Sequence, residues 1–318
     1  MTDQHSYKLS HRHLIGLEEY SRRDISLILE TAASFKEVIN RPIRKVPALR
    51  GKNISNMFFE SSTRTRLSFE LAAKQLSADI LNFGSSGSSV SKGESLSDTV
   101  QNIEAMQVDC VIVRHSSAGV PNFLSQCLTS AVVINAGDGA HEHPTQGLLD
   151  MLTIRDAFGT LDGLKVVLIG DITHSRVARS NIWGLRKMGA HVVVCGPPSL
   201  IPKEIDKFGV EVCYRVEEAL SEADVIYTLR IQHERQGEIF FPSLREYATL
   251  FGIDEDRLNL AKPGAIIMHP GPINRGVELD SRVIDNGRSV ILDQVTNGIA
   301  VRMAVLYLLN GGGEHDAE

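Results

Sequence analysis

Short apolar segments alternate with amphipathic segments along almost the whole chain. The apolar segments are rich in Val and Ile, which is typical of buried strands, and the segments between them repeat apolar residues at helical spacing. This alternation predicts an α/β fold in which open, mostly parallel sheets are flanked by helices. We expect strands at residues 53–59, 79–83, 109–113, 131–135, 165–169, 191–195, 210–213, 224–228, 264–268 and 289–292. We expect helices at residues 22–38, 64–77, 95–106, 120–127, 144–157, 176–187, 216–221, 243–250 and 296–310.

A domain boundary is expected near residue 150. A helix predicted to begin at Pro144 ends near Gly159, a polar segment follows, and a new strand begins at Lys165. The 318 residues are enough for two domains. We predict domains over 1–150 and 151–310, with a helix at about 294–310 packing back on the first. Since ligands of such folds bind beyond the carboxyl ends of the strands, a cleft between the two halves is the expected site.

Composition and charge exclude several classes of protein. Hydrophobic residues make up 42% of the chain and charged residues 23%, an ordinary globular balance, and the net charge of −6 does not suit a general nucleic-acid surface. The N-terminus is polar, and no apolar stretch approaches the ~20 residues of a membrane span. The four cysteines include no CxxC pair, so neither structural zinc nor a redox motif is indicated. We therefore expect a cytoplasmic protein without metal, membrane or nucleic-acid partners.

The most informative motif joins the strand at 53–59 to the helix at 64–77. Ser62, Thr63, Arg64, Thr65 and Arg66 place hydroxyls and two guanidinium groups at the start of that helix. Free N–H groups and the positive end of the helix dipole lie at the same place, so the motif predicts an anion site, most naturally for phosphate. The alternative is a hydroxyl cap followed by solvated arginines. Two arginines favour the anion site, because a cap needs one oxygen and no guanidinium.

Other candidate residues of the first half follow predicted strands. The Ser-rich loop at 84–95 carries Lys92, which can offer a mobile ammonium to an oxyanion, or the loop is an ordinary surface loop. Arg114 ends an apolar strand and can bind a carbonyl or phosphate oxygen, or form a salt bridge at the sheet rim. Proline suits the first position of a helix, so His143 would lie at a helix start and Gln146 one turn in.

The helix dipole disfavours an imidazolium at this position, so we expect a neutral His143 that donates to a carbonyl oxygen. The spacing of His141 and His143 also suits a metal ion. That interpretation is the weaker one, because no third ligand is identifiable and Pro144 constrains the geometry.

The second half carries arginines at two strand ends. Arg176 opens a helix after the strand at 165–169, in a turn that lacks the GxGxxG fingerprint of dinucleotide sites. Arg230 and Gln232, two residues apart, would project together from an extended strand end. Two arginines suit a dicarboxylate ligand, and ion pairs with Asp171 or Glu234 are the alternative. The turn His269–Pro272 offers backbone carbonyls, because proline cannot donate, or is only a rigid turn.

In this order, the motifs resemble those of the carbamoyltransferases, and most closely those of the aspartate type. The matching motifs are Ser-Thr-Arg-Thr-Arg, Lys-Gly-Glu in a Ser-rich loop, Arg-His, His-Pro-Thr-Gln, Gly-Asp-x4-Arg, Arg-x-Gln-x-Glu-Arg and His-Pro-Gly-Pro. The resemblance covers nearly the whole chain. It implies transfer of a carbamoyl group from carbamoyl phosphate to L-aspartate in pyrimidine synthesis, without a cofactor, by a homotrimer with sites at the subunit interfaces. It also implies a carbamoyl-phosphate-binding first domain and an aspartate-binding second domain.

The resemblance assigns roles to individual residues. It implies that the phosphate-binding residues are Ser62, Thr63, Arg64 and Thr65. It implies that the ligands of the carbamoyl carbonyl oxygen are Thr65, Arg114 and His143. It implies neighbours of the carbamoyl NH2 in Gln146, Gly271 and Pro272, and aspartate contacts in Lys92, Arg176, Arg230 and Gln232. Ser88 and Lys92 match a loop that reaches into the neighbouring subunit's site. Of these residues, Arg64, Thr65, Arg114 and His143 are the candidate catalytic groups.

Three rival functions and one open question accompany this resemblance. An ornithine carbamoyltransferase would carry a His-Cys-Leu-Pro turn, where this chain has His-Pro-Gly-Pro and arginines in the 230s. A non-catalytic scaffold homologue is the second rival, and a nicotinamide oxidoreductase, weakened by the missing glycine fingerprint, is the third. Gly271 stands where leucine is common in relatives that carry regulatory chains. The resemblance thus leaves open a plain trimer, a dimer of trimers with regulatory chains, or an assembly with dihydroorotase.

Overall fold

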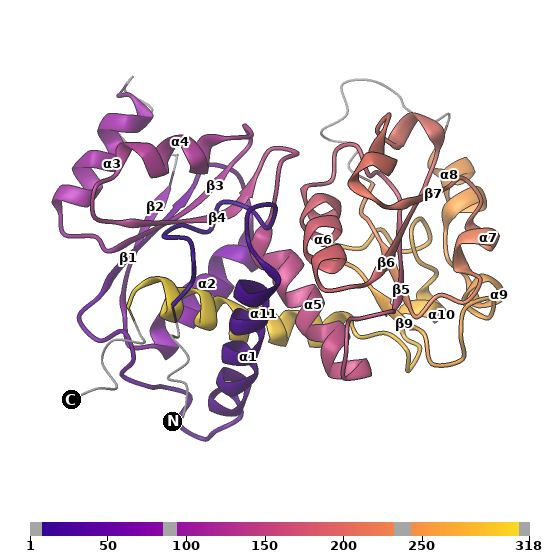
Figure 1. Cartoon of the computed structure of the whole chain (residues 1–318), viewed down its shortest axis with the longest axis horizontal. Helices are drawn as coiled ribbons and strands as arrows, with labels where there is room; N and C mark the ends of the chain where they lie inside the picture. The colour runs from indigo at the N-terminus through magenta and orange to yellow at the C-terminus, as the bar shows by residue number, and fades with distance from the viewer. Residues whose placement is uncertain (1–7, 85–93, 232–242, 312–318) are drawn as a thin grey trace. The chain divides into compact units, whose positions relative to one another are not determined.

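The computed structural model describes residues 8–84, 94–231 and 243–311 (Figure 1). The chain divides into two compact units, one formed by Met1–Leu152 with Thr296–Glu318 and the other by Thr153–Val295. Two helices, α5 (Pro144–Phe158) and α11 (Ile291–Leu309), contain residues of both units. In the described part of the chain, no helix is both long and apolar enough to span a membrane.

The first unit is built on a four-stranded parallel sheet. Its strands are β1 (Asn53–Phe58), β2 (Asp79–Gly84), β3 (Cys110–His115) and β4 (Val132–Asp138), in the order β2-β1-β3-β4. Because every pairing is parallel, the carboxyl ends of the strands lie at one edge. The segments that follow β1, β3 and β4 are therefore brought together there.

Helices cover both faces of this sheet. α3 (Leu96–Ala105) and α4 (Val120–Cys127) lie on one face, and α1 (Arg22–Ile39), α2 (Thr63–Gln75) and α11 lie on the other (Figure 1). Side chains alternate between the faces of a strand. Val111 and Val113 belong to the core under α3 and α4, and the intervening Ile112 is fully buried on the other face.

The second unit is built on a five-stranded parallel sheet. Its strands are β5 (Lys165–Ile169), β6 (His191–Cys195), β7 (Glu211–Cys213), β8 (Val225–Thr228) and β9 (Ile266–Met268), in the order β7-β6-β5-β8-β9. The chain winds outward in opposite directions from β5, so β5 and β8 flank the switch point at which ligands bind in such sheets. Its helices are α6 (Arg176–Lys187), α7 (Val216–Leu220), α8 (Leu244–Phe251), α9 (Glu255–Leu258) and α10 (Ser281–Ile284), with 3₁₀ turns at Pro198–Leu200 and Ile205–Phe208. The two parallel sheets confirm the expected α/β fold.

One predicted strand is absent from the described part of the chain, and the buried face of α2 is a further detail. The strand predicted at 289–292 is wrong: Ser289 forms only an isolated bridge to Ile267, and α11 already begins at Ile291. A run as short as Val290–Leu292 cannot by itself distinguish a strand from the first turn of a helix. In α2, the buried apolar face is formed by Phe69, Ala72 and Ala73, whereas Leu67 and Leu71 are 52% and 42% exposed.

Candidate active site

The N-terminus of α2 follows β1 and carries the hydroxyl and arginine motif. Ser62 is the N-cap residue, in extended backbone conformation, but its side chain makes no capping hydrogen bond. The N-cap serines of α1, α3, α6 and α8 all do accept a backbone N–H in their first turn. The first bond within α2 runs from the Arg66 N–H to the Ser62 carbonyl, at 3.2 Å. Ser62 therefore does not cap the helix end that carries Thr63, Arg64 and Thr65, of which only Thr65 is buried.

Arg114 lies at the same edge of the sheet. It is the penultimate residue of β3, inside the strand rather than after it, and only 9% of it is exposed. Its Nη1 donates to the Ala136 carbonyl at 3.1 Å, and its Nε lies 2.7 Å from Glu60 Oε1. Glu60 comes shortly after β1, the strand that pairs with β3. The guanidinium is thus fixed between the ends of neighbouring strands, and this ion pair is the salt bridge that the sequence offered as the alternative, with a partner, Glu60, that it did not name.

His143 stands at the start of α5, where the sequence placed it. Only 4% of it is exposed, and its carbonyl accepts from the Gln146 N–H at 2.9 Å. Gln146, one turn into the helix, is 9% exposed, and its Nε2 donates to Asp150 Oδ1 at 3.0 Å. Both side chains therefore have positions set by the beginning of one helix.

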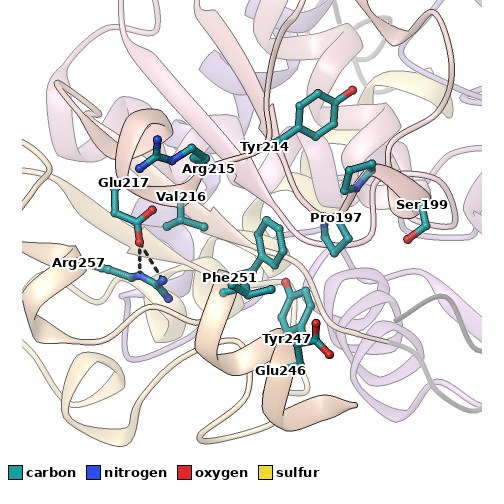
Figure 2. Close-up of a pocket in the computed structure, with 12 residues that line it drawn as sticks. Pro197, Ser199, Tyr214, Arg215, Val216, Glu217, Glu246, Tyr247, Phe251 and Arg257 are labelled. Atoms are coloured by element: carbon teal, nitrogen blue, oxygen red, sulfur yellow. Dashed lines mark hydrogen bonds and ion pairs between the residues drawn. The ribbon is translucent and has the colours of Figure 1, made fainter. Parts of the chain in front are cut away.

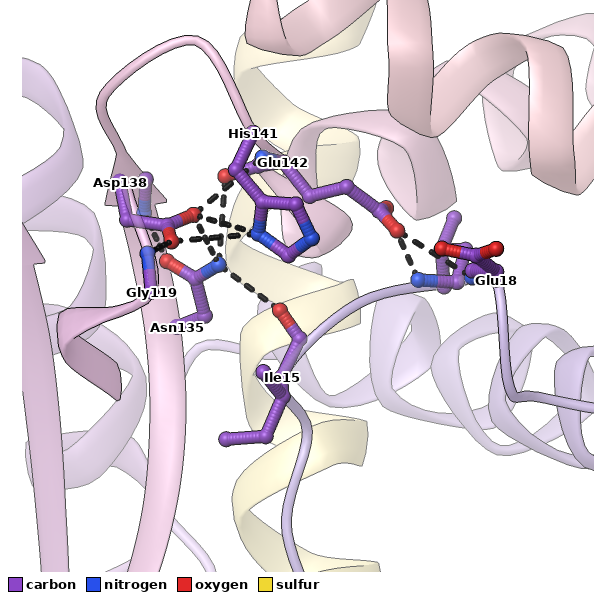
Figure 3. Close-up of polar contacts among 9 residues, drawn as sticks. Ile15, Glu18, Gly119, Asn135, Asp138, His141 and Glu142 are labelled. Atoms are coloured by element: carbon purple, nitrogen blue, oxygen red, sulfur yellow. Dashed lines mark hydrogen bonds and ion pairs between the residues drawn. The ribbon is translucent and has the colours of Figure 1, made fainter. Parts of the chain in front are cut away.

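The loop between β4 and α5 is held by a buried carboxylate, Asp138 (Figure 3). One oxygen of Asp138 accepts from the Gly119 N–H at 2.7 Å. The other accepts from Asn135 Nδ2 at 2.7 Å and from the Glu142 N–H at 3.2 Å. The His141 ring nitrogen Nδ1 lies 3.1 Å from both oxygens. This network fixes the residues immediately before His143 and gives His141 a structural partner.

Glu142 ties the same loop to the N-terminal segment. Its carboxylate, 1% exposed, accepts from the Leu17 N–H at 2.8 Å and the Glu18 N–H at 3.2 Å (Figure 3). A Cβ at Gly16 would lie 2.3 Å from Glu142 Oε1, so the segment approaches closely only with glycine there. Within the described ranges, no cluster of three or more His, Cys, Asp or Glu side chains could hold a metal ion.

In the second unit, Arg176 is the first residue of α6 and is 6% exposed. The turn before it is fixed by Asp171, whose carboxylate lies 3.0 Å from both the backbone nitrogen and ring Nδ1 of His174. Gly170, with φ of +134°, lets this turn approach Leu229, because an added Cβ would lie 3.1 Å from Leu229 Cβ. Arg230, half-buried, follows directly. Arg176 and Arg230 thus follow the paired strands β5 and β8, at the same edge of the second sheet.

A buried carboxylate joins the end of β8 to the turn after β9. Glu278, 1% exposed, accepts from the Ile231 N–H at 2.9 Å and from the backbone and side-chain nitrogens of Asn274 at 2.8 and 2.7 Å. Burial raises the pKa of Glu278, although these hydrogen bonds oppose the shift. In the turn itself, Gly271 donates to His269 Nδ1 at 2.7 Å. His269 thus holds Gly271, and Glu278 holds Asn274 in the same turn; neither was identified from the sequence as a functional side chain.

Three predicted site residues, Ser88, Lys92 and Gln232, lie outside the described residues. Ser62, Thr63, Arg64, Thr65, Arg114, His143 and Gln146 belong to the first unit, and Arg176, Arg230, Gly271 and Pro272 to the second. Within each unit, the predicted residues gather at the carboxyl edge of the sheet. Pro272 is exposed and Gly271 half-buried.

A cavity of about 500 Å³ in the second unit is a separate feature (Figure 2). Its walls include Pro197, Tyr214, Tyr247 and Phe251, and none of the predicted site residues lines it. Arg257 at its rim donates to Glu217 and to the carbonyls of Thr249 and Gly252. This guanidinium therefore ties α7 to α8 and α9.

Comparison with known proteins places this arrangement in a family. Residues 12–156 match the family model described as "Aspartate/ornithine carbamoyltransferase, carbamoyl-P binding domain". Residues 162–309 match the model described as "Aspartate/ornithine carbamoyltransferase, Asp/Orn binding domain". The aspartate carbamoyltransferase catalytic subunit of Cytophaga hutchinsonii is 59% identical over 304 residues, covering 96% of this chain and 99% of that protein.

Solved structures agree with this assignment. The aspartate transcarbamoylase of Trypanosoma cruzi, in complex with carbamoyl phosphate and aspartate, is 32% identical with a TM-score of 0.83, covering 93% of this chain and 96% of that one. The ornithine carbamoyltransferase of Pyrococcus furiosus is also 32% identical, with a TM-score of 0.84 and coverage of 95% and 97%. The resemblance drawn from the motifs is confirmed: the chain belongs to the aspartate/ornithine carbamoyltransferase family.

Proposed function

We propose that this protein is an enzyme that transfers the carbamoyl group of carbamoyl phosphate to the amino group of L-aspartate. The products are N-carbamoyl-L-aspartate and phosphate. Relatives that are 57–59% identical are named aspartate carbamoyltransferase catalytic subunits, which favours aspartate over ornithine as the acceptor. The related Trypanosoma cruzi enzyme has been seen with both carbamoyl phosphate and aspartate bound.

The observation that carries this proposal is the uncapped start of α2. The side chain of its N-cap serine accepts from none of the amides of the first turn, unlike the N-cap serines of four other helices. A phosphate group satisfies such amides and is attracted by the helix dipole. Ser62, Thr63, Arg64 and Thr65 supply hydroxyl and guanidinium donors at the same place, so we assign them to the phosphate of carbamoyl phosphate.

The reaction needs positioned donors rather than a protein nucleophile. The uncharged aspartate amine attacks the carbonyl carbon of carbamoyl phosphate, and the carbonyl oxygen takes up negative charge. The bond from carbon to the phosphate oxygen then breaks, the electron pair leaves with phosphate, and the phosphate accepts the amine proton. Thr65, Arg114 and His143 are assigned to the carbonyl oxygen, and Arg64 to the departing phosphate. Donors aimed at charge that grows in the transition state lower the barrier most.

Arginines of the second unit suit a diacid acceptor. Arg176 and Arg230 follow neighbouring strands of one parallel sheet, and each can bind a carboxylate of aspartate. The same two guanidinium groups would repel the cationic side chain of ornithine. Lys92 and Gln232 are assigned to aspartate as well. Gln146 and the carbonyls of Gly271 and Pro272 are assigned to the carbamoyl NH2 group.

The assembly belongs to the same proposal. We assign Ser88 and Lys92 to the active site of a neighbouring subunit in a homotrimer that works in pyrimidine synthesis in the cytoplasm. Leu67 and Leu71 form an exposed apolar pair one turn apart on α2, directly after the phosphate motif. An apolar pair exposed beside a site is the kind of surface that another subunit covers. Native mass measurement tests the trimer, and also any bound regulatory chain or dihydroorotase.

A substrate comparison tests the function. Phosphate release and carbamoylated product are measured with carbamoyl phosphate and either L-aspartate or L-ornithine, at matched concentrations. We expect turnover with aspartate and a far lower kcat/KM with ornithine, and the reverse preference would overturn the proposal. Binding of a bisubstrate mimic that carries a phosphonate and two carboxylates is measured in parallel. A chain that binds neither the mimic nor carbamoyl phosphate would be a scaffold instead.

A further inference from the structure

Gln146 has two chemically different ends, and only one suits its proposed role. The carbamoyl NH2 group donates, so it needs the amide oxygen of Gln146 and would be opposed by the amide nitrogen. The two orientations have nearly the same shape, so packing alone does not choose between them. A neighbouring polar group must therefore determine which end of the Gln146 amide faces the ligand. This inference rests on the proposed function, because that function assigns the carbamoyl NH2 group to Gln146.

Asp150 is the polar group that the Gln146 amide contacts in the next turn of α5. It lies four residues further along α5, is fully buried, and accepts from Gln146 Nε2 at 3.0 Å. An ionised carboxylate can only accept hydrogen bonds. As long as Asp150 is charged, it therefore holds the Gln146 nitrogen and leaves the Gln146 oxygen for a ligand.

Arg302 on α11 supplies the positive charge near Asp150. It is 4% exposed, its guanidinium lies 5.1 Å from the centre of the Phe69 ring, and its Nη1 donates to the Gly298 carbonyl at 2.9 Å. Burial lowers the pKa of Arg302 to about 10, and the charge of Asp150 acts in the opposite direction. Arg302 is thus a cation at neutral pH, and its charge and that of the Asp150 carboxylate attract each other.

Gly298 makes room for this guanidinium. An added Cβ at Gly298 would lie 2.6 Å from Arg302 Nη1 and 3.2 Å from Leu149 Cδ2. Leu149 is the neighbour of Asp150 on α5, so the contact brings α11 against the turn of α5 that carries the carboxylate. All of these residues belong to the first unit, together with Phe69 of α2.

We propose that Asp150 and Arg302 are positioning residues that fix the amide orientation of Gln146, so that its oxygen accepts from the NH2 group of the carbamoyl donor. Neither residue contacts the substrate in this scheme. Phe69 and Gly298 hold the Arg302 guanidinium in place. The chain thereby distinguishes an NH2 group from a methyl group through a network that begins on α11.

Two phosphonates test this inference because they differ only at the group concerned. Phosphonoacetamide carries an NH2 group where acetonylphosphonate carries a methyl group, and both are measured as inhibitors competing with carbamoyl phosphate. One hydrogen bond corresponds to roughly a 2- to 12-fold preference of wild type for the amide. In Asp150→Asn, the new side chain can donate to Gln146 as well as accept, so its orientation is no longer fixed. We expect the preference to fall towards the value of a variant without the Gln146 acceptor, while the Ki of acetonylphosphonate changes less than twofold.

Controls separate orientation from folding. Asp156→Asn makes the same change at an exposed position of α5 and should leave both Ki values as in wild type. Gln146→Leu removes the acceptor and gives the preference expected without it. The double variant Asp150→Asn/Arg302→Met leaves no uncompensated buried charge, so it can fold even where the single variant does not. It should show the same selective loss.

The outcomes are distinct. A selective loss for the amide inhibitor in Asp150→Asn or the double variant supports the inference. Equal rises in both Ki values, or an unchanged preference in a folded variant, would overturn it. If wild type binds neither phosphonate, the proposed function fails instead of this inference.

Discussion

Replacing Arg64 by alanine removes the one guanidinium that we assign to the departing phosphate. Arg64 is exposed and is the second residue of α2, where a cation opposes the helix dipole. Its removal should relieve about 0.3–1 kcal/mol of that repulsion, and alanine is the best helix former. We therefore expect Arg64→Ala to leave the free energy of unfolding unchanged or slightly raised.

The loss of activity should be far larger than any change in stability. Removing one preorganised donor from a developing oxyanion costs about 2.7–4 kcal/mol, which corresponds to a fall of roughly 10²–10³ in kcat. Because Arg64 is assigned to the donor substrate, the KM for aspartate should change by less than about threefold. Steady-state rates at varied concentrations of both substrates give these constants, and thermal denaturation gives the stability.

Arg66→Ala is the matched control for this experiment. Residues two apart on a helix point about 200° away from each other, and Arg66 lies near Glu70, which follows it by one turn. We expect this variant to keep kcat within a few-fold of wild type. A fall of less than tenfold in Arg64→Ala, or an equal fall in Arg66→Ala, would refute the assignment of Arg64.

Three further changes test different parts of the structure. Asp138→Asn places an NH2 group among the donors that Asp138 accepts from. We therefore expect the free energy of unfolding measured in urea to fall by about 1–3 kcal/mol, and kcat to fall as well. Unchanged values would contradict the role of the Asp138 network. Despite desolvation, hydrogen bonds from Ser10 and Ser21 lower the pKa of Asp24 to about 2. The ionised carboxylate therefore stabilises the folded state above the unfolded pKa of Asp24, and this stabilisation is lost as pH falls towards 2. The urea midpoints of wild type and Asp24→Asn should accordingly converge as pH falls from 6 to 3. A difference between the two midpoints that stays constant with pH would contradict this role of Asp24. Mixing inactive Lys92→Ala chains with inactive Arg176→Ala chains should restore activity in hybrid trimers, and no recovery would mean that each site belongs to one chain.

Local chemistry made much of the fold and part of the candidate site predictable. The start of α5 carries its own signal, because Pro144 suits a first helical position and cannot donate a hydrogen bond. The hydroxyl and arginine motif likewise predicted a helix start, and α2 begins at Thr63. In each case, residues next to one another in the sequence determine the local structure.

The supporting carboxylates have no such local signal. Glu142 accepts from Leu17, 125 residues away, and Glu278 from Ile231, 47 residues away, so neither contact can be inferred from neighbouring residues. Asp150 and Arg302 likewise come together only after α11 packs against α5. An acidic residue among the apolar residues of a helix does indicate that polar partners lie nearby, because a buried charge requires them. The sequence does not say which partners those are.

The double attachment of Glu278 bears on attempts to change the acceptor amino acid. One side chain anchors both the strand end that carries Arg230 and, through Asn274, the bend that carries Gly271. Selection for a new acceptor would naturally randomise the arginines first. Libraries that also vary Glu278 should lose donor recognition along with acceptor choice, whereas libraries that keep it can explore side chains at position 230 on an intact support.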